Sequence, residues 1–320
     1  MSLVDHQTNK GTFFSEWAAA WDGFWFTPRD QTMLGLIRIL VGCLVFYTHA
    51  VWTLELSTFF GADGLLPVEY RELLFGNSFA WSHLGWFQSP TSLMVVHWIG
   101  LAVIALFTIG VWARWTGLLT ALLVISYANR ATGALFGLDQ INAFLCLYLT
   151  VGNSGAALSL DAWRKRRSKR MNDSEQSSWL ESTEPPDTST NLAIRLIQIH
   201  MCVVYLFAAI GKLQGETWFT GEAIWGALAS HEYQTLDMTW LSGHLWLVAI
   251  ITLGALAWEL TYAALIWPRL TRPIMLVIAI PIHLGIGICM GMLEFGLIML
   301  IGNLAFFELL WLRRLARIRK

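Results

Sequence analysis

Long apolar stretches decide what this chain can fold into. A helix needs about 20 apolar residues to cross the hydrocarbon core of a bilayer, and stretches of that length recur along the sequence. We expect membrane spans at 33–53, 91–112, 115–135, 140–160, 192–213, 244–267, 273–292 and 293–311. The last two form one tract, which we divide at 291–294 because a tract of that length would cross twice. The sequence therefore predicts an all-α, polytopic integral membrane bundle with about eight transmembrane helices.

The composition agrees with a membrane protein. Hydrophobic residues make up 56% of the 320 residues and charged residues 13%, whereas soluble proteins have about 45–50% and 25%. The 18 tryptophans suit many helix ends at two membrane interfaces. The four cysteines all lie inside apolar runs without CxxC or metal-ligand spacing. Neither a disulfide framework nor a metal site is therefore predicted.

Motifs of soluble enzymes are missing from the sequence. It contains no P-loop, no GxGxxG after a strand, no GxSxG and no HExxH, the patterns of nucleotide, acyl-transfer and metalloprotease sites. The net charge is −1, and membrane topology together with anionic lipid explains the basic run at 164–170. Nucleic acid is therefore not an expected partner. The expected partners are the lipid bilayer and a small lipophilic substrate.

Basic residues predict the orientation in the membrane. They cluster after the fourth span, at 164–170, and after the eighth, at 313–320, with a few more before the first and after the second and sixth. With eight spans all these segments lie on one side, whereas the opposite loops carry Arg71 alone. The positive-inside rule then places both termini in the cytoplasm. We expect a multi-pass protein of the bacterial inner (cytoplasmic) membrane.

The same pattern divides the chain into five parts. Trp17, Trp21 and Trp25 recur at helical spacing, which predicts an amphipathic helix over 13–26 lying on the membrane surface. The segment after the fourth span is basic and then acidic and polar, which is typical of a disordered linker. The predicted parts are a cytoplasmic N-terminus (1–32), a first four-helix half (33–163), a disordered cytoplasmic linker (164–191), a second four-helix half (192–312) and a basic cytoplasmic tail (313–320).

Three charged residues are predicted to have structural roles inside the membrane. Arg38 lies toward the cytoplasmic end of the first span, Glu259 lies in the cytoplasmic half of the sixth, and Arg195 opens the fifth. Charges inside a bilayer are costly and usually pair. We expect these residues to form ion pairs that fix the helix register.

A second set of polar residues is predicted in the outer half of the spans. Its members are His49, Arg130, Asp139, Gln140, Asn142, Tyr205, Lys212 and, near mid-depth, His283. One interpretation is an outward-facing polar chamber, roofed by the long loops 54–90 and 214–243. The other is that each residue is a hydrogen-bonded structural group or an interfacial one. The sequence leaves both open.

Lys212 ends the fifth span and is the most informative member of this set. At 100° per residue, a polar stripe runs through Gln198, Tyr205 and Lys212, with Arg195 at its margin. A polar stripe on a spanning helix faces a bundle interior or a water-filled cavity. A lysine at a helix end can also extend to the lipid headgroups. The stripe is therefore compatible with a functional base and with an interfacial lysine.

Several short blocks occur in the order of a known family. They are 36–42, 59–67, 205–213 followed by Trp218 and Gly221, 259–261, 271–273, and the stretch from His283 to 291–292. Together they resemble the HTTM (horizontally transferred transmembrane) domain, the membrane part of vitamin K-dependent gamma-carboxylase-like proteins. The resemblance covers nearly the whole chain outside 164–191, and the block around Lys212 is its most specific part.

The resemblance implies an enzymatic role for Lys212. In the family's carboxylases a lysine at this place in the motif is the base that starts oxidation of vitamin K hydroquinone. The oxygenated product then removes a gamma proton from glutamate, and carbon dioxide adds. A base must be a neutral amine, which desolvation or a neighbouring cation such as Arg130 would favour. By resemblance, Lys212 is the catalytic base and vitamin K hydroquinone or another quinol is its substrate.

Two departures argue against a true protein carboxylase. Animal carboxylases carry an Asn-His pair at the start of the fourth span, where this sequence has Leu138-Asp139-Gln140-Ile141-Asn142. The large soluble domain that follows the membrane part of the carboxylases is also missing after Lys320. We therefore expect a short prokaryotic-type member, a gamma-carboxylase-like lyase or quinol-oxidising enzyme. The alternative is a non-catalytic membrane protein that binds lipid or quinone, or an assembly partner. A transporter is disfavoured because no inverted repeat is visible.

Overall fold

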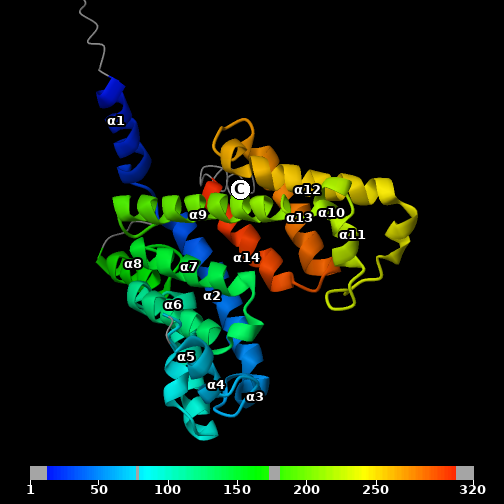
Figure 1. The fold of residues 1–320 in the computed structure, drawn as a ribbon. Helices are drawn as coiled ribbons and strands as arrows, with labels where there is room; N and C mark the ends of the chain where they lie inside the picture. The colour runs from blue at the N-terminus through cyan, green and yellow to red at the C-terminus, as the bar shows by residue number, and fades with distance from the viewer. Residues whose placement is uncertain (1–12, 77–78, 173–180, 308–320) are drawn as a thin grey trace, which may run out of the picture.

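The computed structural model describes residues 13–76, 79–172 and 181–307, and Figure 1 shows its fold. Within these residues the named elements are helices, and the β contact between Arg29 and Asp187 is an isolated bridge. Among the described residues, five helical segments are long and apolar enough to cross a membrane: Thr32–Phe60, Pro90–Ile109, Thr188–Lys212, Leu245–Leu265 and Arg272–Cys289. The prediction of an all-α, multi-pass protein is thus confirmed. The number of eight spans and their orientation stay predictions.

The first group of helices consists of α2 (Thr32–Trp52), α5 (Pro90–Ile109), α6 (Ala113–Arg130) and α7 (Gly137–Val151), which pack against one another. α2 buries Leu34, Ile37 and Val41 completely. Pro90 opens α5, at a position where a helix makes no use of a backbone N–H. Gly110 ends α5 in the left-handed conformation, with φ 75°. This tight end lets α6 begin after a short turn and pack beside α5.

The second group consists of α9 (Thr188–Lys212), α12 (Leu245–Leu265), α13 (Arg272–Cys289) and α14 (Leu293–Asn303), the last continued by η5 (Leu304–Phe306). α9 packs on α12, and α13 packs on α14. The two groups meet where α14 contacts α2 and α7 and where α7 contacts α9, as Figure 1 shows. Their buried residues form one continuous core, which includes Leu34 of α2, Ile197 of α9 and Ile298 of α14.

A turn separates α13 from α14, as the division of the last apolar tract predicts. α13 ends at Cys289, and Gly291 adopts a left-handed conformation, φ 68°, that costs glycine little. α14 begins at Leu293 and packs back against α13. The two helices approach closely at Gly296, where an added Cβ would collide with the backbone oxygen of His283. The predicted break in this tract is confirmed.

α1 (Phe13–Phe26) has the bounds expected for the amphipathic N-terminal helix. None of its residues is buried, and it projects from the bundle in Figure 1. Trp17 stacks on Trp21 with ring centroids 5.5 Å apart. Asn191 Nδ2 donates to the carbonyls of Phe24 and Trp25, at 2.8 Å each, which attaches the end of α1 to the start of α9. The position of α1 on the membrane surface stays a prediction.

Both long loops contain short helices. The loop after α2 holds η1 (Thr53–Glu55), α3 (Leu56–Phe60), α4 (Val68–Phe75) and η2 (His83–Trp86), and the loop after α9 holds α10 (Glu216–Thr220), α11 (Ala223–Leu228) and η4 (Thr239–Gly243). The second loop packs on α12, where Ile224 N donates to Thr252 Oγ1 at 3.2 Å. The loop therefore contacts one side of the first half of α12.

The expected disorder of 164–191 is wrong at both ends of that segment. Its beginning belongs to α8 (Leu160–Asn172). Its end is held by the hydrogen bond from Thr183 N to Ala156 O, 2.9 Å, and by the bridge between Arg29 and Asp187. Local composition could not show these contacts because the partners lie far along the chain. Residues 1–12, 173–180 and the predicted tail 313–320 lie outside the described residues.

Candidate functional site

An ion pair joins the end of α9 to α12. Lys212 Nζ lies 2.6 Å from Glu259 Oε2 and 2.8 Å from Oε1. The two side chains are 25% and 12% exposed, so the pair is largely enclosed by protein. The ammonium also lies over the ring of Trp218, 5.3 Å from the ring centroid, where the aromatic face attracts a cation. Lys212 is thus directed toward two partners from its own chain.

This pairing shows how α9 and α12 are offset. Lys212 is the last residue of α9, whereas Glu259 lies well inside α12. α9 therefore ends beside the interior of α12, and α10 and α11 contact α12 instead of a longer α9. The sequence pattern assigned Lys212 and Glu259 to opposite halves of the membrane because it treated the two helices as level. That separation is wrong, since the two side chains touch.

A buried hydrogen-bond chain connects the four helices of the second group. Tyr205 Oη of α9 lies 2.6 Å from His283 Nε2 of α13, and Asn303 Nδ2 of α14 donates to the same Oη at 2.9 Å. Tyr262 Oη of α12 donates to Asn303 Oδ1 at 2.5 Å. His283 and Asn303 are each 3% exposed, and both tyrosines are less exposed still. The chain therefore fixes four helices through fully enclosed polar groups.

The direction of the Tyr205–His283 hydrogen bond depends on the imidazole tautomer. The amide of Asn303 donates to Tyr205 Oη, and this hydroxyl either donates to His283 Nε2 or accepts from it. His283 Nδ1 is buried and has no hydrogen-bond partner within the described residues. It is a ring nitrogen to which a water or a bound molecule can form a hydrogen bond.

Tyr205 and Lys212 lie about two turns apart on one face of α9. Glu259 and Tyr262 are one turn apart on α12, so the ion pair and the hydrogen-bond chain are neighbours on the same helix interface. We call Lys212, Glu259, Tyr205, His283 and Asn303 the α9–α12 site. Of the predicted chamber residues, this site unites Tyr205, Lys212 and His283.

The remaining chamber residues lie in the first group of helices. His49 Nδ1 donates to Val45 O at 2.9 Å, and its ring packs against Tyr127 with centroids 4.8 Å apart. Arg130 donates to the carbonyls of Leu66, at 2.6 Å, and Gly61. Arg130 therefore holds the loop after α2. The sequence suggested Arg130 as a charged neighbour of Lys212, but the charged group beside Lys212 is the carboxylate of Glu259.

Three residues near the start of α7 have separate surroundings. Asp139 Oδ2 accepts from Phe136 N at 2.9 Å and so caps the helix. Gln140 is exposed. Asn142 is buried, and its Oδ1 has no partner within the described residues. The structure thus divides the predicted polar set between two clusters rather than gathering it in one chamber.

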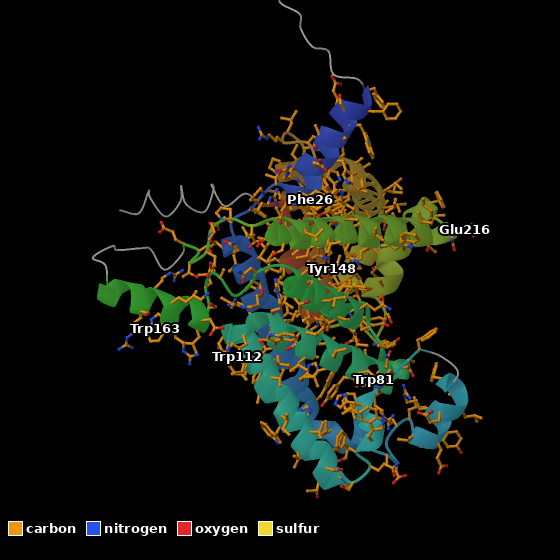
Figure 2. All side chains as sticks on the ribbon, turned by 90° about the vertical axis from the view of Figure 1, so that its left-hand side faces the viewer. Phe26, Trp81, Trp112, Tyr148, Trp163 and Glu216 are labelled. Carbon is orange, nitrogen blue, oxygen red and sulfur yellow. The ribbon has the colours of Figure 1, made fainter. Side chains whose placement is uncertain are left out.

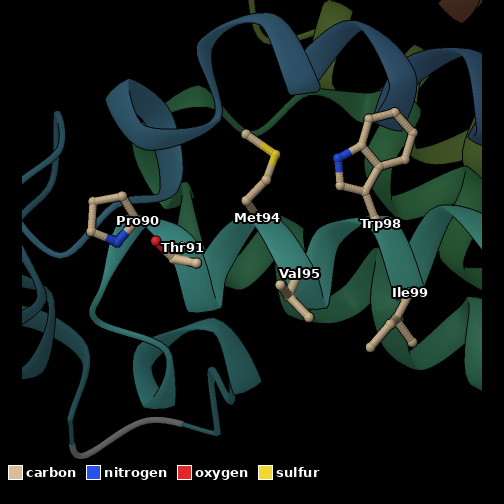
Figure 3. Close-up of a pocket in the computed structure, with 6 residues that line it drawn as sticks. All are labelled: Pro90, Thr91, Met94, Val95, Trp98 and Ile99. Atoms are coloured by element: carbon tan, nitrogen blue, oxygen red, sulfur yellow. The ribbon is translucent and has the colours of Figure 1, made fainter.

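Cavities in the described part of the chain lie away from Lys212, and three of them are distinct in position. Figure 3 shows the first, a shallow groove of about 580 Å³ on α5, where Met94 and Trp98 point to one side and Val95 and Ile99 to the other. The second, of about 560 Å³, lies where α6 and α8 begin. The third, of about 80 Å³, lies beside Tyr127. Within the described residues no cluster of three metal-binding side chains occurs.

A family model for the HTTM domain matches residues 26–311, from just before α2 to just beyond η5. The chain belongs to the HTTM domain family. The match encloses the α9–α12 site and all the helices from α2 to α14, so the resemblance seen in the short sequence blocks is confirmed. Neither the comparison with curated proteins nor that with solved structures produced a match.

The intramembrane arginines of this HTTM domain bind backbone rather than carboxylates. Arg38 is fully buried and donates to the carbonyls of Ser154 and, at 2.5 Å, Leu158. Arg195 Nε donates to the carbonyl of Phe24 at 3.1 Å, Nη1 donates to Gln198 Oε1 at 2.9 Å, and the guanidinium carbon lies 4.0 Å from the centroid of the Phe24 ring. The expected ion pairs of these two arginines with Glu259 are wrong. Turns and helix ends leave carbonyl groups without partners, and an arginine fork can satisfy several of them at once.

Sequence analysis missed two polar members of the HTTM core, Tyr262 and Asn303. Tyr262 follows Glu259 by one helical turn, a spacing that places both on one face of α12. Asn303 is a buried amide inside an otherwise apolar tract. A buried polar side chain in such a tract needs a hydrogen-bond partner, and this was the signal that could have found it.

Proposed function

We propose that this HTTM protein deprotonates a small lipophilic hydroxyl compound of the membrane, namely vitamin K hydroquinone or another quinol, and so starts its oxidation. The observation that carries the proposal is the contact between Lys212 and Glu259 at the α9–α12 site. The likeness of the Lys212 block to the lysine motif of the carboxylases supports the substrate class.

The ion pair is a suitable place for a proton to move. Removing two opposite charges from water costs free energy. The same pair can instead be neutral, with the proton on Glu259 and Lys212 as an uncharged amine. The amine then takes the phenolic proton of the quinol. The O–H bond breaks, an N–H bond forms, and the electron pair stays on the quinol oxygen. The new ammonium lies beside the face of Trp218, which stabilises a cation.

Tyr205 and His283 have a positioning role in this proposal. Their hydrogen bond, 2.6 Å long, holds α9 against α13 about two turns before Lys212. An amine must lie within about 3 Å of the proton that it takes, so the placement of α9 sets the reach of Lys212. Neither Tyr205 nor His283 contacts the quinol in this proposal.

The test is oxygen uptake by the full chain in nanodiscs supplied with vitamin K hydroquinone. Lys212→Ala should lower the rate by about 100-fold or more, since it removes the general base. Lys212→Arg should lower it as strongly, because a guanidinium does not give up its proton near neutral pH. Lys165→Ala is the matched control: it also removes a paired lysine, 2.7 Å from Glu184, and should leave the rate unchanged. A normal rate in folded Lys212→Ala would refute the proposal.

A second candidate is a non-catalytic membrane protein that binds lipid or quinone, or an assembly partner. The observation that favours it is that Lys212 donates to both carboxylate oxygens of Glu259. Such an ion pair can serve only to hold α9 against α12. This candidate expects no quinol-dependent oxygen uptake by the native chain and normal quinone binding by Lys212→Arg. Measuring uptake and binding on the same preparations separates the two functions.

A further inference from the structure

We propose that the cavity where α6 and α8 begin binds the phosphate group of an anionic phospholipid. This cavity, which we call the α6–α8 cavity, has a volume of about 560 Å³. It is lined by the first residues of α6, the 152–156 loop and the first turn of α8, so it is formed by elements other than those of the α9–α12 site. The inference is independent of the proposed quinol chemistry.

Basic side chains surround the opening of this cavity. Arg114, Arg164 and Lys165 line it together with one carboxylate, Asp161. Arg164 lies 3.7 Å from Asp161, and Lys165 is paired with Glu184. Arg114 is exposed and takes part in none of the ion pairs among the described residues. One guanidinium at the cavity is therefore available to an anion from outside the chain.

The N-terminus of α6 opens onto the same space. α6 has 18 residues, and its N-cap residue, Trp112, has no side-chain acceptor for the N–H groups of the first turn. Asp161 accepts from the backbone of Trp112 itself, at 2.7 Å, and so does not cap that turn. The free N–H groups at a helix N-terminus, together with the helix dipole, favour a bound phosphate.

A buried guanidinium lies directly behind the cavity wall. Arg38 is fully buried, and it donates to the carbonyls of Ser154, which lines the cavity, and of Ala157, at 3.5 Å. Its Nε has no hydrogen-bond partner within the described residues. The carboxylate that its charge interacts with is Asp161, which also lines the cavity. Arg38 therefore fixes the 152–156 loop and adds a buried positive charge beneath the cavity, which Asp161 offsets in part. A charge of this kind strengthens the field that attracts an anion.

Two tryptophans favour a lipid, not free phosphate, as the source of the anion. Trp112 and Trp115 are 73% and 69% exposed, and both line the cavity. Tryptophan rings at the ends of membrane helices lie at the level of the lipid headgroups. Figure 2 shows Trp112 at the edge of the bundle, beside α8 with Trp163. A phospholipid places its phosphate at Arg114 and its glycerol and acyl chains against these rings, whereas inorganic phosphate uses only the charges.

Native mass spectrometry of the full chain in detergent tests this site. Separate titrations use phosphatidylglycerol, phosphatidylcholine and inorganic phosphate. The native chain should bind phosphatidylglycerol at a saturable site, and Arg114→Gln should weaken that binding about tenfold, the loss expected for one charge-assisted contact. Arg114→Lys should recover part of the affinity. Arg269→Gln is the matched control, because it removes an exposed arginine from the end of another helix pair, between α12 and α13, and should bind normally.

Each other outcome overturns the assignment. Equal binding of phosphatidylcholine would show that a net negative charge is not recognised. Equal affinity in Arg114→Gln and the native chain would place the lipid elsewhere on the protein. Displacement of phosphatidylglycerol by inorganic phosphate at a similar concentration would mean that the cavity is a site for free phosphate. Because Arg114 is exposed, its replacement should leave the thermal unfolding temperature unchanged, which confirms that folded protein is compared.

Discussion

Lys212 Nζ and Glu259 Oε2 lie 2.6 Å apart, and this contact holds the last residue of α9 against the interior of α12. The contact can have two roles, to fix the two helices and to present an amine to a substrate. Reversing the pair keeps the first role and removes the second, because the amine then projects from α12. The two roles are therefore separable by mutation.

Glu259→Gln should destabilise the protein by about 1–3 kcal/mol. A fully buried charge without its partner costs about 3–5 kcal/mol, and the 25% exposure of the Lys212 side chain reduces that penalty. The combined variant Lys212→Glu with Glu259→Lys should recover most of the lost thermal stability, measured by unfolding in detergent. It should remain inactive toward vitamin K hydroquinone. A double variant as unstable as the single one would show that the pair does not hold the helices.

Tyr205→Phe should destabilise the bundle by about 1–3 kcal/mol, the cost of leaving buried polar groups unpaired. The change removes the acceptor of Asn303 Nδ2 and the hydrogen-bond partner of His283 Nε2. Thermal unfolding measures the loss. Tyr47→Phe is the control, since Tyr47 is 53% exposed and surface changes cost at most about 0.5 kcal/mol. Equal stability of the two variants would contradict a stabilising role for the hydrogen-bond chain.

Gly296→Ala should separate α13 from α14 and lower stability by about 1–3 kcal/mol, as overpacking does. The new methyl group would meet the backbone oxygen of His283, which cannot rotate away as a side chain could. Gly285→Ala is the control on α13, because nothing lies within 4 Å of its added Cβ. That control should be neutral or slightly stabilising, since alanine is the better helix former. Thermal unfolding of the two variants in one detergent decides the point.

Asp187, just before α9, should make stability depend on pH. Its burial opposes ionisation, but hydrogen bonds from Gln31 Nε2 (2.8 Å), Thr190 N (2.6 Å) and Ser189 Oγ (2.8 Å) outweigh it, and the pKa of Asp187 is lowered. The unfolded chain therefore takes up this proton at a higher pH than the folded one. The stabilisation is complete above the ordinary aspartate pKa of about 3.9 and is lost as the pH falls through the lowered folded value.

The variant Asp187→Asn isolates this contribution, because asparagine still caps a helix but does not ionise in this range. Between about pH 5 and pH 2.5, which spans the ordinary aspartate pKa and the region below it, its unfolding temperature should fall less than that of the native chain. Parallel curves for the two proteins would assign the acid sensitivity to other carboxylates.

Local signals were sufficient to predict many elements of the fold. The tryptophan spacing predicted α1 with its observed bounds, and the glycine-containing break before Leu293 predicted the turn into α14. Both features depend on residues that are neighbours in the chain. Helical periodicity also placed Tyr205 and Lys212 on one face of α9, and both belong to the α9–α12 site.

The partners of the charged residues could not be predicted in this way. Whether Lys212 meets Glu259 depends on how far α9 and α12 are offset, and the path of the intervening loop decides that. Arg38 binds backbone carbonyls that become free only once the chain turns after α7. Periodicity within one helix carries no information about either relationship, so treating the helices as level gave the wrong partners.

The end of α9 is closed by its own backbone. The N–H groups of residues 213–215 donate to the carbonyls of Ala209, Gly211 and Lys212, at 2.9, 3.2 and 3.0 Å. A helix end normally exposes four carbonyl groups that require hydration, but here the following turn satisfies three of them. The helix can therefore end with few of its peptide groups in need of water. The ion pair of Lys212 and Glu259 is then the main polar group at this helix end, so a hydroxyl compound that enters here meets a charged side chain rather than unpaired backbone.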